Sequence, residues 1–169
     1  MSSFFPDRLQ TGLTAAEYVS RWREKLGSEL KGLDKEARKR LYYVRYNFER
    51  FERVAAQYEI SEALKQASRG ISEPQMWMLL TEDWCGDSAY ALPVVNAAVH
   101  HSDHVELRLL NRDENLDIMD DYLTNGGRSI PKLVAFDMSG QEIFRWGPRP
   151  QVLAELRQQW QQDGADPRT

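Results

Sequence analysis

A single cysteine, Cys85, lies in the stretch Trp84-Cys85-Gly86-Asp87-Ser88, and no other cysteine occurs in the chain. This stretch follows an apolar run and precedes a helix-forming segment, so we expect Cys85 at a helix N-terminus. The free backbone N–H groups and the helix dipole stabilise a thiolate there, which is the nucleophilic form of cysteine. Ser88 could donate a hydrogen bond to the sulfur, whereas the carboxylate of Asp87 opposes a second negative charge. Cys85, Ser88 and Asp87 are therefore the candidate catalytic residues.

A second group of reactive side chains is the histidine cluster His100, His101 and His104. His100 and His104 have the i,i+4 spacing that would let them share a metal ion on a continuous helix. The favoured interpretation is a helix end, where a protonated imidazole interacts favourably with the dipole. We therefore assign no metal site from the sequence.

Composition narrows the class of protein. The 169 residues are 41% hydrophobic and 28% charged, which is typical of one globular domain. The net charge is +4 over residues 1–70 and −8 over residues 71–169, too mild a contrast to indicate nucleic-acid binding. No apolar window approaches the roughly 18 residues that a membrane span needs. No secretory signal is recognised at the start, and a lone cysteine favours a reducing, cytoplasmic compartment.

The first 70 residues are predicted to be a helical extension. Residues 1–13 have no clear pattern and are expected to form an irregular arm. Thr14 and Glu17 have the spacing of a capping box, which predicts a helix from there to Gly32. Asp34 can cap a second helix, and Ser61 can cap a third that ends at Gly70.

The second predicted helix carries an apolar stripe with alternating spacings of three and four residues, formed by Leu41, Val44, Phe48, Phe51, Ala55 and Tyr58. Such a stripe is typical of a helical hairpin or a coiled-coil seam, so a homodimer through these helices is one prediction. The aromatic run LYYVRYNFERF within it could stack on bases or a cofactor, but burial is the favoured interpretation.

Residues 71–162 predict a separate α/β domain. Three short apolar runs, QMWMLLTE, VELRLLN and KLVAFD, predict buried strands, and EIFRWG predicts a fourth strand joined by a hairpin. Helices are predicted in SAYALPVVNAAVHH, with Pro93 as a kink, in ENLDIMDDYL, and in PQVLAELRQQWQQ, which should cover the sheet. Residues 163–169 are expected to form a loose tail. The predicted fold is α/β, with a mixed sheet of about four strands flanked by helices.

These features together resemble the thioredoxin superfamily over roughly residues 74–162. Trp84-Cys85-Gly86 follows a strand, Pro93 lies eight residues after the cysteine, and Ile130-Pro131 precedes a strand as the cis-proline loop does in thioredoxins. The string EDWCGDS is similar to a bacterial thioredoxin-like subgroup whose fourth motif position varies. The resemblance implies that Trp84, Gly86, Ile130 and Pro131 form a substrate platform, at which an extended segment pairs with the Ile130 backbone. Lys132 would help to attract an anionic thiol.

The chain also departs from the thioredoxin pattern. Ser88 stands where the second cysteine belongs, and Leu79 and Leu109 match the positions of a buried aspartate and its lysine partner. Those three groups serve the resolving half of dithiol exchange, so their joint absence points to monothiol chemistry.

Two functions are compatible with these residues. The first is a monothiol protein that forms mixed disulfides with protein or small-molecule thiols through Cys85, with glutathione as a candidate co-substrate and no other cofactor required. Reversible peroxide sensing through a sulfenic acid belongs to the same class. The second is a non-catalytic interaction module built on the same fold.

Overall fold

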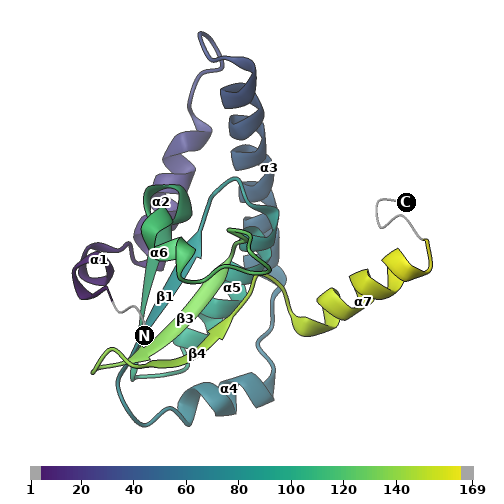
Figure 1. Cartoon of the computed structure of the whole chain (residues 1–169). Coiled ribbons are helices and arrows are strands. Elements are labelled where there is room, and N and C mark those ends of the chain that lie inside the picture. The colour runs from purple at the N-terminus through teal and green to yellow at the C-terminus, as the bar shows by residue number, and fades with distance from the viewer. Residues whose placement is uncertain (1–4, 165–169) are drawn as a thin grey trace.

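Seven helices and four strands make up the described part of the chain, residues 5–164 of this computed structural model (Figure 1). The helices are α1 (Pro6–Thr11), α2 (Ala15–Leu26), α3 (Lys35–Gln57), α4 (Glu62–Arg69), α5 (Gly86–Val99), α6 (Leu116–Asp120) and α7 (Gln151–Gln162). The strands are β1 (Gln75–Thr81), β2 (Val105–Asn111), β3 (Lys132–Asp137) and β4 (Glu142–Trp146). A turn of 3₁₀-helix, Arg112–Glu114, follows β2.

The strands form one mixed sheet in the order β2-β1-β3-β4. Strands β1 and β2 are parallel because α5 returns the chain between them, and β3 and β4 are antiparallel because a tight turn joins them. Strand β3 pairs antiparallel with β1, which places β1 and β3 at the centre. The predicted α/β fold with a mixed four-stranded sheet flanked by helices is confirmed.

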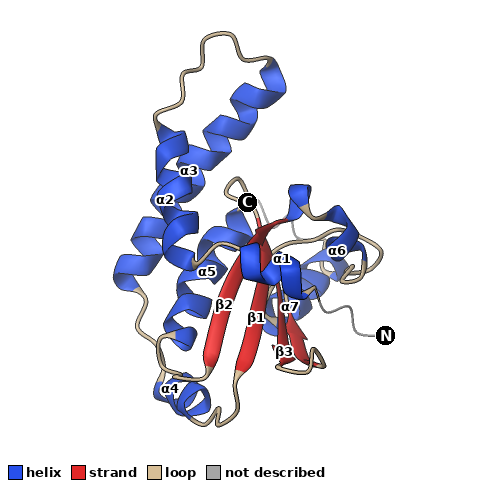
Figure 2. Cartoon of the chain, turned by 90° about the vertical axis from the view of Figure 1, so that its left-hand side faces the viewer, coloured by secondary structure: helices blue, strands red, loops and turns tan. Residues whose placement is uncertain are grey.

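Strand β1 is buried on both faces and so divides the core into two layers. Because side chains alternate along a strand, Trp77 and Leu79 face one layer while Met78 and Leu80 face the other. The first layer is completed by α2, α3 and α5, and the second by α1 and α6 (Figure 2). The reactive segment therefore emerges from the most buried strand of the sheet.

Helices α2 and α3 pack side by side and share the first core layer with α5. The Trp22 indole N–H donates to the Val44 carbonyl at 3.0 Å, and the Trp22 ring meets Phe48 at 5.5 Å between centroids. Leu41, Val44 and Phe48 of the apolar stripe are thus buried within the chain itself, whereas Ala55 is exposed. All three predicted N-caps are present, since the side chains of Thr14, Asp34 and Ser61 accept hydrogen bonds from backbone N–H groups.

Several sequence predictions about the N-terminal region were wrong. Residues 1–13 are not simply an irregular arm, because α1 forms there and buries Leu9, although residues 1–4 lie outside the described part. Helix α2 ends at Leu26 with Gly27 as its C-cap, not at Gly32, since Leu30 is exposed and has no core to join.

The aromatic run of α3 is only partly buried. Phe48 lies in the core as expected, but Tyr42, Tyr43 and Tyr46 are exposed. The helix turns these three side chains away from α2 and α5, so burial of the whole run was a wrong prediction.

Two predictions in the second half need correction. The helix expected over residues 114–123 is divided into the 3₁₀ turn and the short α6. Helix α7 forms where it was predicted but does not cover the sheet; it projects from the body, and its apolar side chains are exposed (Figure 1). The predicted loose tail, residues 163–169, falls mostly outside the described residues.

Candidate thiol site

Cys85 occupies the N-cap position of α5, directly after the turn that follows β1. Its backbone N–H donates to the Glu82 carbonyl at 3.1 Å, and its carbonyl accepts the first helical hydrogen bond, from Ala89, at 3.2 Å. No side chain caps the first turn of α5, so the N–H groups there face the cysteine without a competing side-chain acceptor. The residue as a whole is half-buried.

The loop before β3 lies against the sulfur. The Ile130–Pro131 peptide is cis, and the Cys85 thiol donates to the Ile130 carbonyl with 3.6 Å between sulfur and oxygen. Ile130 is itself buried in the second core layer, which holds the loop in place. The structure therefore brings together Cys85, Ile130 and Pro131, which were expected at one site from the sequence.

Ser88 is placed differently from the expected geometry. Its side chain is buried one turn into α5, and its hydroxyl has no hydrogen-bond partner among residues 5–164. The expected hydrogen bond to the sulfur of Cys85 is therefore not formed. A buried hydroxyl without a partner carries a desolvation cost, so the first turn of α5 is not optimised for stability.

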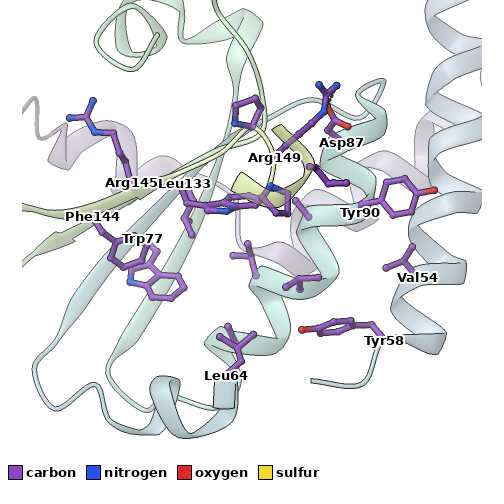
Figure 3. A pocket seen from close by; sticks show the side chains of 18 residues that line it. Val54, Tyr58, Leu64, Trp77, Asp87, Tyr90, Leu133, Phe144, Arg145 and Arg149 are labelled. Atoms are coloured by element: carbon purple, nitrogen blue, oxygen red, sulfur yellow. Dashed lines mark ion pairs between the residues drawn. The ribbon is translucent and has the colours of Figure 1, made fainter. Parts of the chain in front are cut away.

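The carboxylate of Asp87 is paired with a residue that the sequence did not single out. Arg149, in the segment before α7, approaches it with 2.6 Å between nitrogen and oxygen (Figure 3). Both side chains are about one-third exposed. The guanidinium offsets the negative charge that was expected to oppose a thiolate at Cys85.

Trp84 is held between two cations. The guanidinium carbons of Arg40 and Arg112 lie 5.4 and 5.0 Å from its ring centroid. Its backbone carbonyl accepts a hydrogen bond of 2.7 Å from the buried Asn47 amide, which fixes the turn before Cys85. Helix α3 thus contacts Trp84 through Arg40 and Asn47 and positions the reactive segment.

Arg50 of α3 lies over the first residue of α5. Its guanidinium is so close to Gly86 that a Cβ at that position would lie only 2.7 Å from the arginine nitrogen. The side chain donates to Asn47 and packs over the rings of Tyr46 and Tyr90. Within the described residues, Arg50 makes no ion pair with a carboxylate, so its charge is not neutralised at Gly86, the residue that follows Cys85.

Lys132 was expected to attract an anionic thiol, but its side chain is buried. Its ammonium group donates to the Thr124 hydroxyl at 2.7 Å and to the Gly147 carbonyl at 3.1 Å. Burial lowers the pKa of Lys132, and the charge of Arg145 lowers it further. The ammonium group is therefore engaged in joining the loop before β3 to the segment after β4.

Four arginines surround the reactive segment, and sequence reasoning missed all of them: Arg40, Arg50, Arg112 and Arg149. Each lies outside α5. The net positive charge of residues 1–70 was a signal for Arg40 and Arg50 only, and Arg112 and Arg149 had none. Leu79 and Leu109 face each other across β1 and β2 in the core, so no ionisable pair lies under the cysteine at those positions.

The histidines make local contacts. The rings of His100 and His101 each contact a carbonyl one turn back in α5, at 2.7 and 2.8 Å. Over the described part of the chain, no group of three or more histidine, cysteine or carboxylate side chains is placed to hold a metal ion. In the same range, no helix is long and apolar enough to cross a membrane.

A partly exposed cysteine at a strand-to-helix junction, facing a proline loop before a central strand, defines a thioredoxin-like protein. A family profile described as Thioredoxin matches residues 35–161, which is most of the chain. The chain therefore belongs to this thioredoxin family. The match begins at the first residue of α3, so it includes the helix that supplies Arg40 and Arg50.

Two solved structures share the fold. An HIV epitope-scaffold matches with a TM-score of 0.65 and 18% identity, covering 90% of this chain and 81% of the other. A protein of unknown function from Pseudomonas aeruginosa matches with a TM-score of 0.54 and 18% identity, covering 96% and 81%. No curated protein matches. At this identity the two structures support the fold alone.

Proposed function

We propose that this protein is a monothiol thioredoxin-like protein that exchanges thiols and disulfides through Cys85. The observation that carries the proposal is a half-buried cysteine at the N-cap of α5, with the guanidinium of Arg50, which makes no ion pair within residues 5–164, against the next residue, Gly86. A helix N-terminus and a neighbouring cation both favour the thiolate, which is the attacking species.

The first step is attack of the Cys85 thiolate on one sulfur of a disulfide. A bond forms between Cys85 and that sulfur, the original disulfide bond breaks, and the other sulfur leaves as a thiolate. Ser88 has no sulfur with which to resolve the mixed disulfide. An outside thiolate must therefore attack the partner's sulfur, which releases Cys85 as a thiolate and forms a new disulfide between the two outside thiols.

Glutathione fits the role of the outside thiol. It carries two carboxylates, and a guanidinium binds a carboxylate with charge-assisted hydrogen bonds. In this proposal Arg50 replaces the buried Lys132 as the group that attracts the anionic thiol. The exposed part of the Ile130 loop would pair with an extended protein segment when the substrate is a protein. A reducing bacterial cytoplasm is the proposed setting, since it maintains both the free cysteine and reduced glutathione.

The test is intact-protein mass after exposure to oxidised glutathione over a series of pH values. We expect the addition of one glutathionyl group, its removal by reduced glutathione, and no addition in Cys85→Ser. Arg50→Gln should slow the addition by about three- to tenfold at low salt, because one nearby charge is removed. Arg53→Gln is the matched control: it removes the same charge from an exposed position one turn along α3 and should leave the rate unchanged.

Two results would contradict the proposal. One is a folded protein whose cysteine is not modified near neutral pH. The other is an Arg50→Gln variant that reacts as fast as Arg53→Gln, which would remove the electrostatic part of the argument.

The alternative function is a non-catalytic interaction module. It is favoured by the contact between the Cys85 thiol and the Ile130 carbonyl, because a donated hydrogen bond needs the proton to stay on sulfur. The exposed tyrosines of α3 would then be a candidate contact surface. An unreactive cysteine in the experiment above would favour this second function.

A further inference from the structure

Helix α7 leaves the body of the molecule with an apolar face uncovered. Val152, Leu153, Leu156 and Trp160 are all at least one-third exposed. At the helical repeat, these four positions fall within an arc of about 100°, so they form one stripe. Twelve residues of α-helix span about 18 Å, and a stripe of that length needs an apolar surface to cover it.

The same chain contains an apolar groove of about 800 Å³ beside α5 (Figure 3). Its floor is formed by Trp77 and Phe144, whose rings meet edge to face at 5.4 Å between centroids. Val94 on α5 and Leu64 on α4 line its walls. Leu153, on the first turn of α7, reaches the edge of the groove, but the rest of the helix points away (Figure 1).

The segment that joins β4 to α7 is short and stiff. Proline fixes φ at positions 148 and 150, which reduces the conformational freedom of this segment, and residues 148 and 149 form a bend. The ion pair of Arg149 with Asp87 and the hydrogen bond from Lys132 to the Gly147 carbonyl attach this segment to the thiol site. These contacts fix the start of α7 at the edge of the groove. A helix from another molecule is not restrained by them.

We propose that two copies of this chain exchange their α7 helices, each placing the stripe formed by Val152, Leu153, Leu156 and Trp160 in the partner's groove. The exchange is reciprocal and gives a closed two-fold dimer, in which both apolar surfaces of each copy are covered. Short, stiff connections are a recognised cause of such swapping. Because the groove is also lined by Asp87 and Arg149, the partner's helix would form a wall next to the site of Cys85.

The test is the molar mass in solution, measured by light scattering and sedimentation over a concentration series. Wild-type protein should be dimeric at micromolar concentrations. Leu156→Glu alters the helix and Val94→Glu alters the groove. Each should raise the dissociation constant of the dimer at least about tenfold. Gln158→Glu places the same charge on the opposite face of α7 and should leave the dimer intact. Circular dichroism would confirm that all three variants are folded.

Mixing the two defective variants distinguishes exchange from other modes of dimerisation. Leu156→Glu keeps an intact groove and Val94→Glu keeps an intact helix, so an equimolar mixture restores one proper contact. Native mass spectrometry should detect the heterodimer in excess over both homodimers.

Three outcomes would overturn the proposal. A wild-type monomer at all concentrations would mean that α7 folds onto its own groove or serves a different partner. A Leu156→Glu dimer as stable as the wild type would place the interface elsewhere, and a mixture without heterodimer would exclude exchange. None of these outcomes depends on whether Cys85 is reactive.

Discussion

At the scale of single residues, Glu82 is the most unusual group near the site. It lies three residues before Cys85, its side chain is buried, and it accepts a hydrogen bond of 2.8 Å from the backbone N–H of Asp113. The Arg40 guanidinium makes a longer contact with the Glu82 carboxylate, with 3.4 Å between nitrogen and oxygen. Burial raises the pKa of Glu82, and the hydrogen bond and the arginine do not fully offset it. The carboxyl therefore ionises less readily in the folded protein than in the unfolded chain.

This raised pKa predicts a pH-dependent effect of Glu82→Gln on stability. Wild-type stability from this group is fully present below its unfolded pKa, about 4.3, and is lost as the pH rises through the higher folded pKa. The free energy of unfolding of Glu82→Gln relative to wild type should therefore increase between acidic and neutral pH. Urea denaturation of both proteins at several pH values measures this difference.

Glu17→Gln is the control for that experiment, because its stability relative to wild type should change with pH in the opposite direction. Hydrogen bonds from the backbone and side chain of Thr14 lower the pKa of Glu17. Its stabilising effect is present above the unfolded pKa and is lost as the pH falls, so Glu17→Gln should lose stability relative to wild type as the pH rises. If the difference in free energy of unfolding between Glu82→Gln and wild type did not change with pH, the assignment of Glu82 as a destabilised buried carboxylate would be contradicted.

At the scale of elements, the segment after β4 and the proline loop before β3 are fitted closely together. Gly147 has φ +111°, and a Cβ there would lie 2.1 Å from the Pro131 carbonyl oxygen. The Lys132 ammonium group bridges the same two segments. The position of the loop beside Cys85 therefore depends on a backbone contact that only glycine permits.

Gly147→Ala should destabilise the protein by about 2–5 kcal/mol, from strained φ and from the clash with Pro131. Gly126→Ala is the matched control: its φ is also positive, at +76°, but no atom lies within 4 Å of a Cβ there. That variant should cost only about 1–2 kcal/mol. Urea denaturation measures both, and equal losses would contradict the proposed close fit. The rate of Cys85 modification should change in Gly147→Ala and not in Gly126→Ala.

At the scale of the whole molecule, the N-terminal helices belong to the main core. Trp22 is almost fully buried and packs with Phe48 and Phe51, and both helices reach the layer that contains Leu92 of α5. From the sequence, the chain was expected to divide into an extension, residues 1–70, and a domain, residues 71–162. The shared layer favours a single cooperative unit across that boundary.

Trp22→Ala should therefore lower the free energy of unfolding by about 3–5 kcal/mol, because it leaves a large cavity in the shared layer. Tyr42→Ala removes an exposed ring of the neighbouring helix and should change stability by less than about 0.5 kcal/mol. Thermal or urea unfolding measures both. A chain lacking residues 1–60 should fail to fold, and a stable, folded product would instead show that the extension is a separate module.

The sequence by itself determined the order of the elements from α2 onward, the helix starts at Thr14, Asp34 and Ser61, and the place of Cys85 at a strand-to-helix junction. These features are local, because capping, side-chain periodicity and turn residues act over a few positions along the chain. The family resemblance over residues 74–162 added the approach of Ile130 and Pro131 to the sulfur.

Only the tertiary structure decided which side chains meet around that sulfur. Arg50 and Arg149 reach the residues just after Cys85, Gly86 and Asp87, from elements distant in sequence, Lys132 is buried, and α7 leaves its apolar stripe exposed. The physical reason is that an amphipathic pattern tells which face of a helix is apolar but not which surface will cover it. Such contacts depend on how whole elements pack, and no short stretch of sequence contains that information.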